Sequence, residues 1–297
     1  MAGRNKKTLV KAPLASYSES NGIKVYSAPL KTLKGWNVPS IVENGKTHSY
    51  DMAIVSSFGY FIPERIIKSF SYGAMNIHPS LLPKYRGASP IQHTIMNNDK
   101  VGGVTIQELH PKVMDAGKII NQKIMDIPQD IYRADLEKIF GDVGGNILIE
   151  TLKNYSELKE KAYCQDESKV SYAPKLDKNI SVIDWNKDTA ADIYSKFRAF
   201  GDKIPLRSLF QNNSKILSIH FYDIFNPEKL NRDEHKEFKG ANPGTILFNW
   251  KSSNSIGIVC SHDTIINIKK VRVEGKSTVS AYDFVNGYSI TQGQMLI

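Results

Sequence analysis

Cysteine is nearly absent from this chain: its 297 residues include only Cys164 and Cys260, far apart and without metal-ligand spacing. Neither a disulfide framework nor a thiolate zinc site is expected, and a reduced compartment fits best. Long apolar runs are missing too, because no segment approaches the roughly 20 residues that cross a bilayer and the first residues lack a secretory signal. The sequence predicts a soluble globular protein with no metal and no membrane association.

Acidic residues are scarce in the first part of the chain. The formal net charge is +9, and the first 50 residues hold eight basic and only two acidic residues. Such a bias is typical of proteins with a polyanionic partner, and nucleic acid is favoured over a membrane because no amphipathic helix accompanies the charge. A solvated, soluble surface explains the same excess equally well.

Strand and helix patterns alternate in the first half of the chain. Short apolar or alternating runs predict strands at 52–55, 74–78 and 103–109, and helices are expected at 63–70, 91–97 and 136–152. This β-α-β order predicts an open, mainly parallel sheet with helices on both faces. In such a sheet ligands gather at the carboxyl ends of the strands.

Two polar residues stand at the end of the second predicted strand. Asn76 and His78 are two residues apart, so both side chains project from one face, and Pro79 marks the strand end. One side chain offers a neutral amide donor, and the other can carry a proton near neutral pH. The pair is suited to handling a carbonyl, although outside any motif such a pair is more often structural.

The second half of the chain changes character. A polar stretch between Tyr163 and Trp185 predicts a linker over the surface, and Asp188 is expected to cap a helix that ends near Gly201. Short β-branched segments follow at 216–221, 244–248, 256–259 and 264–273. Closing these strands into a small barrel is the simplest way to pair the edges of their sheet. The predicted divisions are 1–162, a linker and connecting helix at 163–205, and 206–297.

Several motifs together carry a family resemblance. They are Asn76–Gln92, Gly103–Thr105, Met114–Gly117, Ser171–Lys175, Ile183–Trp185, Phe197–Phe200, Pro243–Ile246 and Ser280–Phe284. Over nearly the whole chain this set closely resembles the folate-dependent formyltransferases, and within them the members that act on methionyl-tRNA. The resemblance implies a formyltransferase-type α/β sheet followed by an OB-like barrel.

The resemblance also implies roles for individual residues. By position, Asn76, His78 and Asp115 would form the catalytic trio, and Ser80, Leu81, Leu82 and Pro83 would line the site for 10-formyltetrahydrofolate. An amine attacking a formyl carbonyl needs oriented donors for the developing oxyanion and a group or water relay that moves protons. Neither a nucleophilic residue nor a metal is required. Arg86, in the same motif, is expected to pair locally rather than touch substrate.

The implied partners are the folate and initiator methionyl-tRNA, with formylmethionyl-tRNA as product and a monomeric enzyme. Basic residues that would approach the tRNA are Arg4, Lys6, Lys7, Lys269, Lys270 and Arg272. For the last three, a solvated barrel face is about as good an explanation. The implied location is the mitochondrial matrix, with a bacterial cytoplasm as the alternative.

Two departures from the family pattern keep other functions open. The chain begins inside a basic loop, Ala2–Thr8, that members reach only after a first β-α-β arm, so this arm is expected to be missing from a truncated chain. The segment 200–205 also differs from the usual Asn-Pro-Trp-Pro-like turn. The alternatives are a formyltransferase that acts on a small amine and a tRNA-binding remnant without catalysis.

Overall fold

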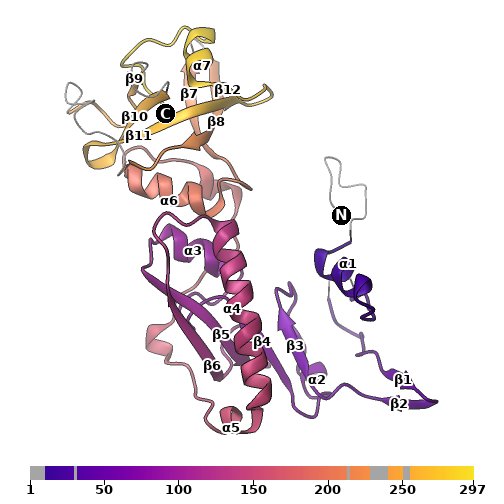
Figure 1. Cartoon of the computed structure of the whole chain (residues 1–297). Helices are drawn as coiled ribbons and strands as arrows, with labels where there is room; N and C mark the ends of the chain where they lie inside the picture. Colours follow the sequence, from indigo (N-terminus) through magenta and orange to yellow (C-terminus); the bar gives the residue numbers. More distant parts are fainter. Residues whose placement is uncertain (1–10, 30–31, 213–214, 228–239, 250–254) are drawn as a thin grey trace. The chain divides into compact units, whose positions relative to one another are not determined.

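The computed structural model of the chain describes residues 11–29, 32–212, 215–227, 240–249 and 255–297 (Figure 1). These residues belong to two compact units. The first unit comprises the chain up to Met75 together with Pro111–Val113, and the second comprises Asn76–His110 and Met114–Ile297. The predicted catalytic residues and the barrel therefore all belong to the second unit.

The first unit holds short elements with little buried surface. They are α1 (Pro13–Ser20), β1 (Ile41–Glu43), β2 (Lys46–His48), β3 (Ala53–Ser56) and α2 (Glu64–Ile67). An antiparallel hairpin joins β1 to β2 through Asn44 and Gly45, which both have positive φ, as a tight two-residue turn requires. The predicted strand at 52–55 is found as β3, and the predicted helix at 63–70 is found as the shorter α2.

The second unit holds β4 (Ala74–His78) from Asn76 onward, β5 (Val101–Glu108) and β6 (Ile119–Asp126), which pair in the order β4-β5-β6. Residues 102–107 of β5 are all buried; four of them are glycine or apolar, and the two polar ones, Thr105 and Gln107, are hydrogen-bonded. The last strand, β6, pairs antiparallel with β5 and was not anticipated, because polar residues occupy its middle. The sheet therefore ends in an antiparallel edge strand.

Three helices accompany this sheet: α3 (Pro90–Met96), α4 (Arg133–Lys153) and α5 (Tyr155–Glu160). Figure 1 shows the long α4 running along the sheet. Its buried positions, Leu136, Phe140, Gly144, Ile147 and Thr151, recur every three or four residues and so form one apolar stripe. A Cβ on Gly144 would lie 3.1 Å from Ile77 Cγ2, so this glycine lets α4 come close to β4.

Helix α6 (Ala190–Phe200) follows the linker and ends at Gly201, as predicted. The prediction that Asp188 caps it is wrong, because Thr189 caps the helix in a reciprocal capping box with Asp192. Asp188 instead accepts a hydrogen bond from the Asp184 main chain and pairs with Lys196. Helix α6 packs on both α3 and β11, so it joins the sheet part of the second unit to the barrel.

The barrel is built from β7 (Leu206–Asn212), β8 (Lys215–Ile224), β9 (Ile246–Asn249), β10 (Ser255–Cys260), β11 (Thr264–Val273), β12 (Val279–Ser280) and α7 (Ala281–Gly287). The strand order is β7-β8-β11-β10-β9, and β12 pairs with β11. Short 3-10 turns lie at Glu167–Lys169, Lys178–Ser181 and Ser261–Asp263. Neither β7 nor β12 was anticipated from the sequence.

The C-terminal segment closes the barrel. Antiparallel bridges join Leu296 to Phe210 of β7 and Met295 to Thr245, just before β9, so one segment spans both edges of the sheet. The Trp185 indole donates to Ser208 Oγ at 2.8 Å, and this hydroxyl donates to the Ile297 oxygen at 2.9 Å. The prediction of a small barrel is confirmed.

Leu296→Ala should lower the free energy of unfolding by about 2 to 5 kcal/mol, because Leu296 is only 4% exposed and its loss leaves a cavity at the closure. The neighbouring Met295 is 44% exposed, so Met295→Ala should cost less than about 1 kcal/mol. Urea unfolding of both variants measures the difference. Equal losses would show that the C-terminal segment does not close the barrel core.

Candidate active site

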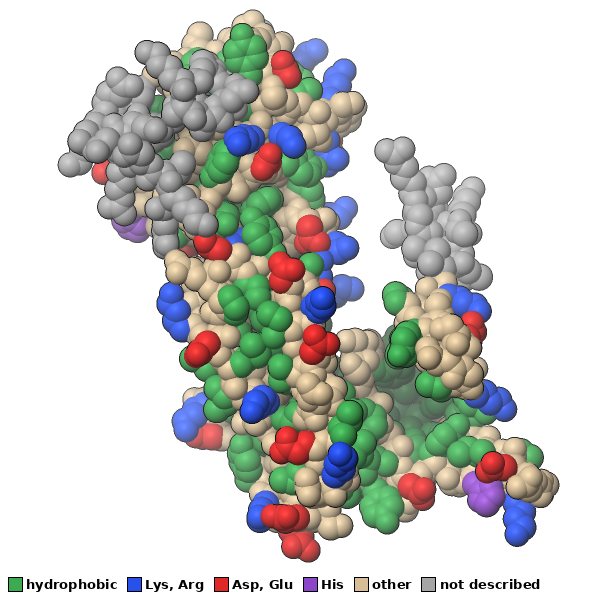
Figure 2. Space-filling model, viewed as in Figure 1, with side chains coloured by type: hydrophobic (Ala, Val, Ile, Leu, Met, Phe, Trp, Pro, Cys, Tyr) green, Lys and Arg blue, Asp and Glu red, His purple; other side chains and the backbone are tan. Residues whose placement is uncertain are grey.

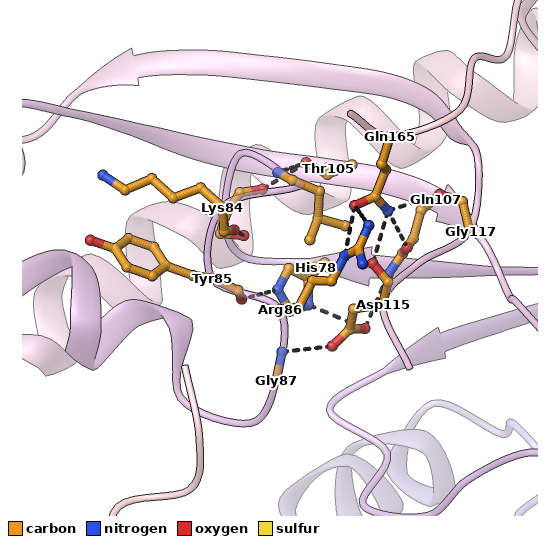
Figure 3. A network of polar contacts seen from close by, with 12 residues as sticks. His78, Lys84, Tyr85, Arg86, Gly87, Thr105, Gln107, Asp115, Gly117 and Gln165 are labelled. Carbon is orange, nitrogen blue, oxygen red and sulfur yellow. Dashed lines mark hydrogen bonds and ion pairs between the residues drawn. The ribbon is translucent and has the colours of Figure 1, made fainter. Parts of the chain in front are cut away.

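His78 is buried at the carboxyl end of β4, with both ring nitrogens facing polar groups (Figure 3). Its Nε2 lies 2.9 Å from the Tyr85 carbonyl oxygen, and its Nδ1 lies 3.6 Å from Asp115 Oδ1. A carbonyl only accepts, so Nε2 carries the hydrogen and donates it. The Nδ1 to carboxylate distance is too long for a direct hydrogen bond and too short for an atom to lie between the two groups, so a water or a substrate atom would bond to both from one side.

The carboxylate of Asp115 is held by two donors. Its Oδ2 accepts from the Gly87 main-chain N–H at 2.9 Å, and its Oδ1 accepts from the Gln107 amide at 3.1 Å. The backbone of Asp115 is left-handed, with φ of 56°, a conformation that most residues avoid. The surrounding contacts therefore determine where this carboxylate points.

Gln165 of the linker braces the turn that carries Asp115. Its amide nitrogen donates to the carbonyl oxygens of Asp115 and Gly117, both at 2.8 Å, and its oxygen accepts from Arg86 Nε at 3.0 Å and Nη2 at 2.8 Å (Figure 3). Arg86 also pairs with Glu167, and this hydrogen bond lowers the pKa of the Glu167 carboxyl. Arg86 was expected to pair locally, but its partners lie 79 and 81 residues further along the chain.

The linker does not merely lie over the surface, which corrects the expectation. Its main chain pairs with the loop after His78: Arg86 donates to the Ser171 oxygen, Ala173 donates to the Arg86 oxygen, and Ser89 donates to the Ala173 oxygen. Gly87 has φ of 124°, and a Cβ there would lie 2.6 Å from the Ala173 oxygen. This close approach requires glycine and brings the linker to the site.

The four predicted folate residues divide into two kinds. Ser80 and Leu82 are buried, and their main-chain groups are bonded to Thr105: its hydroxyl donates to the Ser80 oxygen at 2.6 Å and accepts from the Leu82 N–H at 3.1 Å. Leu81 and Pro83 are partly exposed. Ser80 and Leu82 thus fix the loop, and Leu81 and Pro83 present its surface.

Asn76 lies two residues before His78 on β4, and the two side chains project from the same face. It is partly exposed, and within the described residues its side-chain amide makes no hydrogen bond. The structure therefore offers a free amide donor beside the histidine and carboxylate pair.

Sequence reasoning named neither glutamine of this network. Gln107 stands two residues after Thr105 on β5, so a signal was present: both side chains project from the face that meets the loop after His78. For Gln165 no local pattern exists, because its partners come from three distant segments, at Arg86, at Gln107 and at the turn of Asp115 and Gly117.

The predicted tRNA residues are not gathered on one face. Lys270 and Arg272 point outward from β11, where Lys270 pairs with Asp223 and Arg272 donates to His220 Nδ1 at 2.8 Å. Lys269 projects to the opposite face and lies over the Phe225 ring. The predicted residues Arg4, Lys6 and Lys7 lie outside the described residues.

One outward-facing residue, Arg207, was not predicted. Strand pairing places Arg207, His220 and Arg272 in one row across β7, β8 and β11. Burial, and then the charge of Arg272, lower the pKa of His220, so its imidazole is neutral near pH 7 and accepts from the guanidinium. On this outer face the two arginines therefore lie in one row, on either side of a neutral histidine.

In the part of the chain that the structure describes, no helix is long and apolar enough to span a membrane, and no group of three His, Cys, Asp or Glu side chains is placed to hold a metal.

Fold and site together describe a two-part protein: an α/β sheet that carries a histidine and carboxylate pair at the end of β4, and a C-terminal barrel. Residues 1–152 match the family described as formyl transferase, and residues 175–289 match the formyl transferase C-terminal domain. The chain therefore belongs to the formyltransferase family.

Among curated relatives, the mitochondrial methionyl-tRNA formyltransferase of Bos taurus is 35% identical over 240 residues, which is 80% of this chain and 60% of the relative. The methionyl-tRNA formyltransferase of Dictyoglomus turgidum is 32% identical over 296 residues, covering 98% and 87%. The chain thus spans about 60% of the length of its mammalian relatives, and more of the bacterial ones.

Solved structures with the same fold include HypX from Aquifex aeolicus in complex with tetrahydrofolic acid. Its TM-score is 0.56 at 18% identity, covering 80% of this chain and 39% of HypX. The sugar 3N-formyl transferase WlaRD has a TM-score of 0.53 at 20% identity, covering 89% and 82%. At these identities the likeness shows the fold, and it agrees with the predicted class of sheet domain plus barrel.

Gly117→Ala should lower the free energy of unfolding by about 2 kcal/mol or more, because its Cβ would lie 1.7 Å from the Glu108 carbonyl oxygen and force the backbone apart. Gly145 in α4 is the matched control, since it is exposed and a Cβ there meets nothing within 4 Å. Gly145→Ala should stabilise the chain by about 0.5 to 1 kcal/mol. Denaturant unfolding measures both variants, and a fully stable Gly117→Ala would contradict the close approach.

Proposed function

We propose that this chain transfers a formyl group from 10-formyltetrahydrofolate to the free amino group of methionyl-tRNA, making formylmethionyl-tRNA. The observation that carries the proposal is the meeting of His78 and Asp115 beside the unbonded amide of Asn76. The acceptor is proposed because the curated relatives are named methionyl-tRNA formyltransferases.

Each of the three side chains has its own part in the proposed reaction. The Asn76 amide donates to the formyl oxygen, which gains negative charge as the amine attacks. His78 has committed its Nε2–H to Tyr85, so Nδ1 is the atom that holds a proton or donates toward the reacting centre. Asp115 faces the same nitrogen and holds the water that takes the proton of the amine and returns one to N10 of the folate, as the bond from N10 to the formyl carbon breaks.

The residues around this trio fit a folate as the formyl donor, and the folate supplies the activated formyl group when bound. Leu81 and Pro83 offer partly exposed apolar surface on the loop that follows β4, and the Asn76 amide offers a donor for a carbonyl. Apolar lining with a few placed polar groups is what ligands of this size require.

The barrel is the proposed tRNA-binding surface. Figure 2 shows Lys and Arg side chains spread over the barrel at the top of the view, with fewer acidic ones among them. The outward row of Arg207, His220 and Arg272, together with Lys270, presents positive charge beside Tyr222, over which Arg272 lies at 5.3 Å. Positive charge beside an aromatic ring suits a phosphate backbone.

The proposed location is the mitochondrial matrix and the proposed state is a monomer; a bacterial cytoplasm is the alternative, since relatives are named from both mitochondria and bacteria. No structural observation favours the small-amine acceptor or the non-catalytic remnant. Both are therefore outcomes of the tests below.

Asn76→Ala, His78→Ala and Asp115→Ala should each lower kcat for formyl transfer by about 100-fold or more, because each removes a group that acts in the transition state. Binding of methionyl-tRNA should be nearly unchanged. The measurement is formyl transfer from labelled 10-formyltetrahydrofolate to methionyl-tRNA. Asn146→Ala and Asp142→Ala, on the exposed side of α4, are matched controls.

Full activity in all three variants would contradict the assignment of the trio. An amino-sugar nucleotide offered in competition distinguishes the acceptors, because preferred formylation of the sugar would overturn the tRNA proposal. Binding of methionyl-tRNA without any turnover by the wild-type chain would favour the remnant instead.

Arg272→Gln should weaken tRNA binding and reduce the slope of log affinity against log salt by roughly 0.7 to 0.9, because one phosphate contact is lost. Lys269→Gln is the matched control: it removes the same type of charge from the opposite face of β11 and should leave the slope unchanged. Filter binding across a salt series measures both. Identical slopes in the two variants would show that the outer face of β11 does not contact the tRNA.

A further inference from the structure

We propose that Gln165 of the linker is a positioning residue for Asp115: it does not touch substrate, but it determines where the catalytic carboxylate stands relative to His78. The inference rests on the proposed function, because it assigns Asp115 a part in catalysis. It adds a residue from outside the sheet to the site.

The first reason is the pair of carbonyls that Gln165 binds. Its amide nitrogen donates to the oxygens of Asp115 and Gly117, each at 2.8 Å, so both hydrogens of one group hold the turn at two points. Asp115 has a left-handed backbone, and such a conformation persists only where its surroundings impose it. Gln165 supplies that constraint from the linker.

The second reason is that the amide cannot be turned around. The Gln165 oxygen accepts two hydrogen bonds from Arg86, whose side chain is 3% exposed and has donors only. A flipped amide would place N–H groups against the guanidinium and an oxygen against two carbonyls. The orientation is therefore determined by Arg86, and the donors must face the Asp115 turn.

The third reason is that the same loop also holds the carboxylate. Gly87, next to Arg86, donates its N–H to Asp115 Oδ2 at 2.9 Å (Figure 3). Gln165 thus holds the main chain of Asp115, and Gly87 holds its side chain. Arg86 connects the two, because it binds Gln165 and precedes Gly87 in the chain. Loss of the Gln165 donors lets the turn move away from His78, and a displacement near 1 Å at a catalytic group costs about 100-fold in rate.

Gln165→Glu is the variant to test, because it keeps the acceptor for Arg86 and replaces the donors that face the turn. Its kcat should fall by about 10- to 100-fold, with KM for folate and for methionyl-tRNA unchanged within about twofold. Glu167→Gln is the control: it removes the charge of the other Arg86 partner, which is 72% exposed, and should leave kcat within about twofold. An unchanged kcat in Gln165→Glu would overturn the inference, and so would a rise in KM alone.

A double-mutant cycle with Asp115→Asn separates positioning from general damage. If Gln165 acts through Asp115, adding Gln165→Glu to Asp115→Asn should cost little further activity, whereas independent effects multiply. A multiplied loss would overturn the inference.

A second readout does not depend on transfer. In Gln165→Glu the Gly87 amide should exchange its hydrogen with solvent at least about tenfold faster than in wild type, because its acceptor has moved. Unchanged exchange would overturn the inference even if the wild-type chain formylated nothing, an outcome that would by itself overturn only the proposed function.

Discussion

The site depends on one constraint: the Asp115 carboxylate must stand opposite His78 although its backbone is left-handed. No single element achieves this. Gln107 of β5 and Gly87 of the loop after β4 bind the carboxylate, and Gln165 of the linker binds the turn. A carboxylate held by partners that are themselves packed can be placed to a fraction of an ångström.

This constraint explains why the linker runs where it does. Ser171 and Ala173 pair with the loop after His78, and Arg86 is enclosed between that loop and Gln165. A buried guanidinium without partners would be strongly unfavourable, so the linker and the loop stabilise each other. The segment that leads to the barrel is thus also a wall of the site.

Local sequence was enough for what depends on neighbours along the chain. The spacing of Asn76 and His78 predicted a strand-end pair, and the family resemblance supplied the formyltransferase fold, which the comparisons show. Local sequence failed where distant contacts decide. Strand β6 is polar in its middle, and Gln165 has partners 48 to 79 residues away. Along β11 the buried positions pass from Ile266 and Ile268 to Val271 and Val273, which no single alternation describes.

The most direct test of the account is the protonation of His78, observed by nitrogen-15 NMR of the labelled chain. The account predicts that the neutral ring carries its hydrogen on Nε2, bonded to the Tyr85 oxygen, and leaves Nδ1 toward Asp115. The Nε2 resonance should then show a directly bonded hydrogen. A neutral ring with its hydrogen on Nδ1 would contradict the account, because Asp115 would then bind the histidine directly and Nδ1 would not be open to the reaction.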